Sequence, residues 1–235
     1  MKPLILVGGG GHCKSVIDVA ESMGHSILGI LDLPENVGHF ILGYPVLGTD
    51  DDIPLFVDQA DFIVTVGFIK ESSLRLKIHD KIQTSGGHFG TLIASTAYVS
   101  RHAQIGAGTV VMHHAFVNAG ARIGSGCIIN TFVNVEHDAL IGDNCHISTG
   151  AMVNGDCKVG EGSFLGSQSV MVNGTSIISG CIIGAGSVVR KDILEKGIYS
   201  GNPAILKIKT HDGLYIIDYR RAGLYFIGVR TNGCY

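Results

Sequence analysis

Between residues 93 and 189 the chain repeats one pattern of apolar and polar positions every six residues. An aliphatic or methionine side chain occupies seventeen successive sixth positions, from Ile93 to Val189, without a change of phase. A small residue follows four positions after each of the first sixteen, and Val133 is the largest residue found there. This internal repeat predicts a solenoid of short strands and turns, in which three units form one triangular coil of eighteen residues. Successive coils are expected at strand spacing, about 4.8 Å.

The other positions of each unit have the composition of tight turns. Glycine, asparagine and aspartate dominate the second and fourth positions, and these residues accept positive φ angles and local side-chain hydrogen bonds. Glycine accounts for 34 of 235 residues, about twice ordinary usage. The small interior positions include four of the six cysteines, which we therefore expect in the core: Cys127, Cys145, Cys157 and Cys181.

The beginning of the chain follows a different pattern. An apolar stretch at residues 4–7 predicts a strand that runs into the four glycines of residues 8–11. Apolar residues at helical spacing follow, and Gly24 is a suitable end for that helix. A second strand is predicted at residues 27–31, directly before Asp32. The order strand, glycine-rich turn, helix and strand predicts a β-α-β unit.

The pattern divides the chain into three parts. Residues 1–90 form the predicted Rossmann-like α/β domain, which also contains an apolar strand at 61–67 and a helical stretch at 71–86. Residues 91–195 form the predicted parallel β-helix, so the fold class is mainly β. Residues 196–235 form a C-terminal extension, whose last part, 210–235, is expected either to cap the final coil or to remain without fixed structure.

The glycine-rich turn is a candidate anion site, because free N–H groups point outward at a helix N-terminus. Asp32 follows the next strand, where a carboxylate can accept a hydrogen bond from a ribose hydroxyl. We expect Gly10 to allow close approach of the backbone to the anion and to need a positive φ angle. As a dinucleotide fingerprint the stretch fails, because Cys13 stands where the third glycine is required. The alternative is that the glycines only make a tight turn.

Composition excludes several classes of partner. The net charge is −3 and no basic run exists, so nucleic acid and anionic membranes are not expected as partners. No stretch approaches the roughly 20 apolar residues of a membrane span, and the apolar start is too short for a signal sequence. A cytoplasmic location is therefore expected. No two cysteines form a C-x-x-C pair, which disfavours zinc and redox motifs, and no metal is expected.

The unbroken six-residue repeat resembles that of the hexapeptide-repeat acyltransferases. The resemblance implies a left-handed β-helix and a homotrimer. The front stretches "GGGGHCK", "ILD" and "TVG" and the closing "GIYSGNPAILKI" are similar to one branch of that family. It comprises bacterial N-acetyltransferases of nucleotide-linked aminosugars together with sialic acid O-acetyltransferases. In that branch the front domain holds the sugar nucleotide, and acetyl-coenzyme A lies along the β-helix between two subunits.

The stretch Glu136-His137-Asp138 is the candidate catalytic segment. In the six-residue frame it forms the corner after Val135, and the neighbours of His137 in adjacent coils are the small residues Ala119 and Gly155. An acid beside a histidine fixes its tautomer and stabilises the imidazolium. His137 is therefore the expected general base and Asp138 its orienting residue. The alternative is an idle corner histidine, since His102, His113 and His114 also occupy corners.

The resemblance also assigns binding roles. The residues expected to bind the sugar nucleotide are Gly9, Gly10, Gly11, His12, Lys14, Asp32, Gly67, Asn130 and Glu136. The residues expected on the acetyl-coenzyme A side are His146, Gly155, Ser167 and Ala185. The N–H of Gly155 is also a suitable donor to the oxyanion. For His146 the alternative is a surface histidine without a role.

The expected function is acetyl-coenzyme A-dependent N-acetylation of a nucleotide-linked 4-amino-4,6-dideoxy sugar in bacterial surface glycan synthesis. Direct attack is favoured over an acyl-enzyme, because every cysteine of the repeat region is expected to point inward. One alternative is an O-acetyltransferase of sialic acid or a related sugar. Another is a non-catalytic scaffold or a metal-binding relative such as a γ-class carbonic anhydrase. The sequence does not identify the nucleotide base, the sugar stereochemistry or the function of the last residues.

Overall fold

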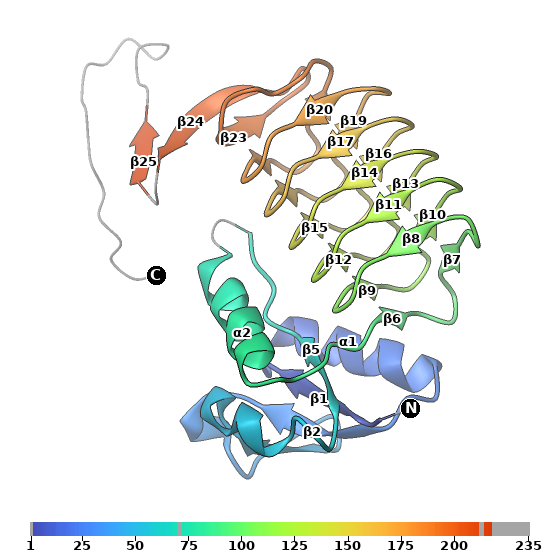
Figure 1. Cartoon of the computed structure of the whole chain (residues 1–235). Coiled ribbons are helices and arrows are strands. Elements are labelled where there is room, and N and C mark those ends of the chain that lie inside the picture. Colours follow the sequence, from blue (N-terminus) through green and yellow to red (C-terminus); the bar gives the residue numbers. More distant parts are fainter. Residues whose placement is uncertain (1, 70–71, 212–213, 218–235) are drawn as a thin grey trace.

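The protein consists of a small α/β domain joined to a long parallel β-helix (Figure 1). The structure, a computed structural model, describes residues 2–69, 72–211 and 214–217. Residues 218–235, which hold most of the expected cap, lie outside this range. Among the described residues, no helix has both the length and the apolar character needed to cross a membrane.

The front domain is built on a five-stranded sheet of order β3-β4-β2-β1-β5. Its strands are β1 (Leu4–Val7), β2 (Ile27–Leu31), β3 (Phe40–Ile41), β4 (Tyr44–Gly48) and β5 (Asp61–Val64). Its helices are α1 (Gly11–Ser22) and α2 (Ser73–Thr84), with short 3-10 turns η1 (Pro34–Asn36) and η2 (Asp50–Leu55). Strand β1 is parallel to β2 and to β5. The predicted β-α-β unit is present.

Helix α1 joins the two parts of the molecule. It begins after Gly10, and the chain leaves it at Gly24 with φ +68°, the left-handed conformation that glycine accepts at a helix end. Its apolar residues share a core with residues of the front sheet and of the first two coils of the β-helix, including Leu92 and Val110. The front domain is therefore packed onto the β-helix rather than tethered to it.

Three parallel sheets form the faces of the β-helix. The sheet covered by the front domain, here the docked sheet, contains β6 (Leu92–Ile93), β9 (Val110–Val111), β12 (Ile128–Ile129), β15 (His146–Ile147), β18 (Phe164–Leu165) and β21 (Ile182–Ile183). The apolar sheet contains β7 (Tyr98–Val99), β10 (Phe116–Val117), β13 (Asn134–Val135), β16 (Met152–Val153), β19 (Val170–Met171) and β22 (Val188–Val189). The polar sheet contains β8 (Gln104–Ile105), β11 (Arg122–Ile123), β14 (Leu140–Ile141), β17 (Lys158–Val159) and β20 (Ser176–Ile177).

The coil length of eighteen residues is confirmed by strand pairing. Val117 pairs with Val135, and Ile129 pairs with Ile147. The sixth-position aliphatic residues fill the interior, where they form one continuous apolar cluster. The four cysteines expected in the core are buried there without disulfides, and the Cys127 thiol donates to the Gly142 carbonyl at 3.1 Å. The interior is therefore closed to solvent along its length.

The end of the β-helix differs from the expected boundary. Strand β23 (Gly197–Ser200) pairs in parallel with β21, so the docked sheet continues beyond residue 195. Strands β24 (Ile205–His211) and β25 (Leu214–Ile217) then add to it in antiparallel fashion. Ile193 and Tyr199 join the interior cluster. Apolar cover for the last coil thus comes from residues that precede 210.

Candidate active site

His137 lies at the corner between β13 of the apolar sheet and β14 of the polar sheet. Asp138 adopts φ +58°, one of the left-handed corner conformations that glycine, asparagine and aspartate accept most readily. At this corner the side chains of the two adjacent residues meet, and His137 Nδ1 lies 3.0 Å from Asp138 Oδ2. Both side chains are more than half exposed. The pair therefore faces solvent in a single chain.

The carboxylate of Asp138 raises the pKa of His137 above its ordinary value, chiefly by the hydrogen bond and then by its charge. Asp156 and Glu136 act in the same direction. When Nδ1–H donates to Asp138, the neutral ring presents the lone pair of Nε2 outward. This is the tautomer that a general base requires.

The imidazole of His137 packs over Gly155 of the next coil. A Cβ at Gly155 would lie 2.7 Å from both Cε1 and Nε2 of the ring. The ring is therefore supported on this side rather than surrounded by open space. Among the described residues, the N–H of Gly155 has no hydrogen-bond acceptor, which leaves it available to a ligand beside Nε2.

Glu136 is fixed by two amides. Asn118 Nδ2 donates to one carboxylate oxygen at 2.7 Å, and Asn134 Nδ2 donates to the other at 3.1 Å. These hydrogen bonds lower the pKa of Glu136 below its ordinary value. Asn118 is the neighbour one coil earlier, and reading every eighteenth residue indicates it. Asn134 lies two residues before Glu136 on the same strand, and no sequence motif indicates its contact.

A concave region lies in the front domain, at the carboxyl ends of β1, β2 and β5. It is a cleft of about 340 Å³. Six of the residues predicted to bind the nucleotide line it: Gly9, Gly10, Gly11, His12, Asp32 and Gly67. Lys14 does not line it and is exposed on α1. The open N-terminal turn of α1 ends in this cleft, so unpaired N–H groups and the positive end of the helix dipole are available to an anion.

The glycines of the turn have different roles. Gly8 has φ +108°, and a side chain there would collide with Val66. A side chain at Gly9 would collide with Asp32 and Ile41. At Gly10 no atom of the described chain lies within 4 Å of a built Cβ, and φ is −71°. The expectation of a positive φ at Gly10 is therefore wrong, because the reversal of the chain occurs at Gly8.

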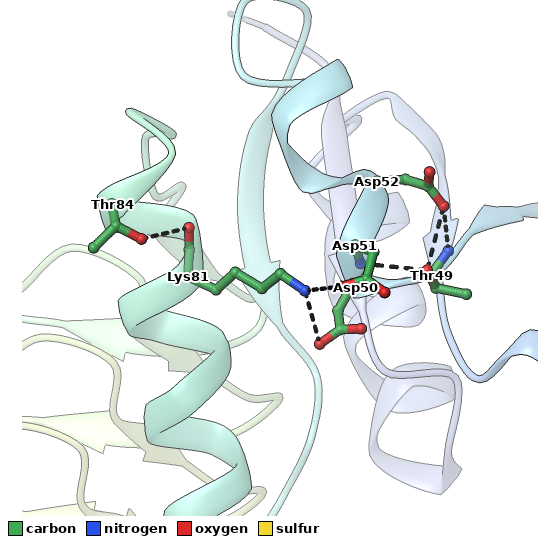
Figure 2. A network of polar contacts seen from close by, with 6 residues as sticks. All are labelled: Thr49, Asp50, Asp51, Asp52, Lys81 and Thr84. Carbon is green, nitrogen blue, oxygen red and sulfur yellow. Dashed lines mark hydrogen bonds and ion pairs between the residues drawn. The ribbon is translucent and has the colours of Figure 1, made fainter.

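Acidic residues mark one side of the cleft. Asp32 accepts a hydrogen bond from Asn36 at 2.7 Å. Asp50, at the start of η2, lies 3.5 Å from Lys81 of α2. Figure 2 shows that Lys81 reaches both Asp50 and Asp51, while Thr49 and Asp52 cap the same turn. The ion pairs hold η2 against α2 and keep Asp50 at the wall of the cleft.

His146 is buried, so the alternative of an idle surface histidine is wrong. Its Nδ1 lies 2.7 Å from the Phe68 carbonyl and its Nε2 lies 3.4 Å from Asn130 Nδ2. Burial lowers the pKa of His146 to about 4. Burial, with smaller contributions from Arg75 and His146, lowers the pKa of His12 to about 3. Both rings are therefore neutral, and His146 donates from Nδ1 and accepts at Nε2.

The predicted residues fall on different faces of one chain. His137 and Gly155 occupy the corner between the apolar and polar sheets. His146 lies on β15 of the docked sheet and Asn130 directly follows β12 of the same sheet, beside the front domain. Ser167 and Ala185 occupy the corner between the docked and apolar sheets, where Ser167 lies 3.0 Å from the Ser148 hydroxyl. A corner of the triangular section is opposite the third face, so His137 does not meet His146 within one chain.

Within the described ranges, no three His, Cys, Asp or Glu side chains are grouped as a metal site requires. The γ-class carbonic anhydrase alternative requires three zinc histidines that converge from two subunits. His137 and His146, which that alternative would use, lie on separate faces.

Comparison with known proteins shows which families the two parts of the chain match. Residues 3–82 match the PglD N-terminal domain family, and residues 120–155 match the family of bacterial transferase hexapeptide repeats. A comparison with curated protein sequences found no match.

Solved structures cover nearly the whole fold. Perosamine N-acetyltransferase from Caulobacter crescentus, solved as a histidine variant with CoA and GDP-perosamine, shares 32% identity and a TM-score of 0.82. The match covers 88% of this chain and 97% of that one. The acetyltransferase domain of PglB from Neisseria gonorrhoeae shares 34% identity and a TM-score of 0.80, with 88% and 100% covered. WeeI from Acinetobacter baumannii, at 22% identity and a TM-score of 0.78, supports the fold alone.

The full-length matches, the matching front domain and the hexapeptide coils together establish the fold as a left-handed β-helix behind a Rossmann-like domain. The chain is an acyltransferase and belongs to the nucleotide-aminosugar branch of the hexapeptide-repeat acetyltransferases.

Proposed function

We propose that the protein transfers the acetyl group of acetyl-coenzyme A to the amino group of a nucleotide-linked 4-amino-4,6-dideoxy sugar. The observation that carries the proposal is the His137–Asp138 pair, held at 3.0 Å over Gly155, in a chain 32% identical to an N-acetyltransferase solved with CoA and GDP-perosamine. The expected biological setting is the synthesis of bacterial surface glycans. Acetyl-coenzyme A is the co-substrate, and the chemistry needs no metal.

His137 acts as the general base in this mechanism. The sugar amine attacks the thioester carbonyl, and Nε2 of neutral His137 accepts a proton from the nitrogen as the new C–N bond forms. Asp138 orients the ring through Nδ1–H and stabilises the imidazolium that results. The Gly155 N–H stabilises the oxyanion of the tetrahedral intermediate. Collapse of that intermediate releases the thiolate of coenzyme A and the acetylated sugar.

The transfer is direct, without an acyl-enzyme. A thiol nucleophile would have to reach the thioester, but Cys127, Cys145, Cys157 and Cys181 are buried in the interior of the coils. Burial raises the pKa of Cys181 above its ordinary value, and thiols of that kind are poor nucleophiles. The amine of the acceptor is then the only nucleophile that the reaction requires.

The front-domain cleft binds the nucleotide. The diphosphate lies at the N-terminal turn of α1 beside Gly10 and Gly11, and Asp32 accepts from a ribose hydroxyl. Leu33, Leu74 and Ile78 supply an apolar wall for the base. The sugar then extends toward Asn130, and His146, 3.4 Å from the Asn130 amide, lies on the acetyl-coenzyme A side.

A homotrimer completes the site in this proposal. His137 of one chain lies opposite its own docked sheet, so the corner of a neighbouring subunit must meet the cleft and the sugar. The outward face of the apolar sheet is suited to such packing. It presents Tyr98, Phe116 and Met152, each more than a third exposed, and the rings of Tyr98 and Phe116 stack at 5.0 Å. Burial of such a face against another subunit is favourable.

The test is an acetyl-transfer assay with UDP-, dTDP- and GDP-linked 4-amino-4,6-dideoxy sugars, free sialic acid and acetyl-coenzyme A. Release of coenzyme A with one nucleotide aminosugar, and mass spectrometry showing an N-acetyl product, are the expected results. Release of coenzyme A only with sialic acid or another free sugar would replace the proposal by O-acetylation. The His137→Ala variant serves as the control for non-enzymatic thioester aminolysis.

A further inference from the structure

A buried arginine links the nucleotide cleft to the β-helix. Arg75 of α2 is 1% exposed. Its Nη1 donates to the carbonyls of Val64 and Val66 at 2.7 and 2.8 Å, and its Nη2 donates to the carbonyl of Gly126 at 2.9 Å. Val64 and Val66 belong to the front domain, whereas Gly126 lies at a corner of the β-helix. One guanidinium therefore spans the junction between the two domains.

The segment that Arg75 holds also contacts His146. The Phe68 carbonyl lies 2.7 Å from His146 Nδ1, and the Phe68 ring packs edge-on against His146 and Phe164. The carbonyls of residues 64, 66 and 68 thus all accept hydrogen bonds from side chains of other elements. Residues 65–67 between them form one wall of the cleft. This short segment, residues 64–68, is the physical connection between the cleft and the docked sheet.

The chemistry of Arg75 is unusual for a residue that only supports the fold. Its three acceptors are neutral carbonyls, and no carboxylate of the described residues pairs with it. Its Nε has no hydrogen-bond partner among those residues, and the same is true of His12 Nε2 and His79 Nε2 nearby. Burying a cation without a counter-charge is unfavourable, so an apolar residue or a lysine on the surface would serve a purely structural junction better.

The imidazoles of His12, His79 and His146, which lie near Arg75, are not positively charged at neutral pH. Burial is the main cause that lowers the pKa of His12, His79 and His146, and the charge of Arg75 adds to it in each case. Arg75 therefore remains the cation of this junction at neutral pH, because burial lowers its own pKa only to about 10. The planar guanidinium of an arginine has several N–H donors and can bind three carbonyls at once. The ammonium of a lysine cannot do so in the same geometry.

We infer that Arg75 is a positioning residue, which holds segment 64–68 so that a nucleotide bound in the cleft presents its sugar to Asn130, beside His146. The inference rests on the proposed function for the identity of the ligand. The contacts themselves involve only residues of this chain. Loss of Arg75 should loosen the segment at Val64 and Val66 and change acceptor binding without touching the groups that react.

The experiment compares Arg75→Met, Arg75→Lys and the control Lys77→Met. Lys77 lies on the same helix and is exposed, so its replacement removes one cation without removing the junction contacts. We expect Arg75→Met to raise the KM of the nucleotide sugar about 10- to 100-fold. The KM of acetyl-coenzyme A should change less than about threefold, and kcat should fall less than the acceptor kcat/KM. Arg75→Lys should be intermediate, and Lys77→Met should match wild type.

Hydrogen–deuterium exchange gives a readout that does not depend on activity. In Arg75→Met, peptides covering residues 61–69 and 124–130 should exchange at least about tenfold faster than in wild type, while peptides of coils 150–180 should be unchanged. Calorimetry with GDP, UDP and dTDP measures nucleotide binding in the cleft separately from acetyl transfer. If wild type neither binds these nucleotides nor transfers acetyl groups, the proposed function fails, and the exchange data still decide whether Arg75 couples the two domains.

Three results would overturn the inference. The first is an Arg75→Met protein with wild-type kinetics and wild-type exchange. The second is a rise in both KM values and a fall in kcat of similar size, together with a loss of thermal stability. That result would indicate a structural residue only. The third is failure of both Arg75→Met and Arg75→Lys to fold, as judged by circular dichroism and mass in solution, because the arginine would then be required for the fold itself.

Discussion

The imidazole of His137 occupies the space that a side chain at Gly155 would need. A Cβ at Gly155 would lie 2.7 Å from Cε1 and from Nε2, a separation that real Cβ atoms do not show. His137 and the glycine come from successive coils, eighteen residues apart in sequence, at the same corner of the β-helix. The small size of residue 155 is therefore a requirement of the proposed catalytic geometry as well as of the corner.

Gly155→Ala should displace the His137 ring and reduce kcat by about 10- to 100-fold, because general-base catalysis depends on the position of Nε2. The atoms that meet the new Cβ most closely belong to the exposed His137 ring, which can move, so the thermal unfolding temperature should change little. Steady-state kinetics and a thermal melt of the same preparation test both statements. Wild-type kcat in a folded Gly155→Ala protein would mean that the ring position in the structure is not the catalytic one.

His137→Ala should lower kcat by about 10²–10⁴-fold. The fold should persist, because the side chain is more than half exposed and contributes nothing to the interior cluster. His102→Ala, at another exposed corner, is the matched control and should retain activity. Near-normal turnover of the His137 variant between pH 6 and 9 would exclude His137 as the base.

The pH profile should report the His137–Asp138 pair. The pKa of His137 is raised, first by the hydrogen bond to Asp138, and the base must be neutral to act. Activity should therefore fall as the pH is lowered through a pKa that lies above the ordinary histidine value. Asp138→Asn removes the main cause of the rise, so its acid limb should move to lower pH, while its maximal kcat should fall less than in His137→Ala. An unchanged acid limb in Asp138→Asn would assign that limb to another group.

Gly10 and Gly9 form a matched pair for the nucleotide cleft. Gly10→Val meets no atom of the described chain within 4 Å and has an ordinary φ angle, so it should fold and raise only the KM of the nucleotide sugar. Gly9→Val collides with Asp32 and Ile41 and should also lower thermal stability. Calorimetry with nucleoside diphosphates and thermal melts separate the two effects. Normal nucleotide binding by folded Gly10→Val would show that the diphosphate does not bind at this turn.

The proposed trimer can be tested by substitutions on the exposed faces of the β-helix. Met152→Glu places a charge in the outward column of the apolar sheet, and it should convert a trimer to monomers in light scattering at micromolar concentration, with loss of activity. Lys158→Glu changes an outward residue of the polar sheet and should leave the mass unchanged. A fully active wild-type monomer would contradict the composite site.

The sequence predicted the repeating part of the fold well because the constraint is local and repeated. Each interior position, such as Val135 or Ile147, must fill the same small triangular section, so its residue type recurs every six positions. Columns of neighbours could also be predicted, since residues eighteen apart must stack. The contact of Asn118 with Glu136 follows that rule.

Contacts between the two domains could not be predicted in the same way. The hydrogen bonds from Arg75 to Gly126 and from His146 to Phe68 join residues 51 and 78 positions apart, and no period relates them. The burial of His146 has the same origin, because the front domain covers a strand residue that points outward. The glycine turn was only partly predicted, since Gly8, rather than Gly10, carries the positive φ angle.

The coil of eighteen residues also limits how chains of this architecture can change in length. An insertion of one residue between His137 and Gly155 would shift every later column and separate the two residues. An insertion of a whole coil would preserve every column and only add one layer, about 4.8 Å, to the stack. Length variation inside the β-helix should therefore occur in multiples of eighteen residues or as loops that leave a corner and return to it. Evolution can lengthen this enzyme stepwise, at a fixed increment, without rebuilding the corner formed by His137, Asp138 and Gly155.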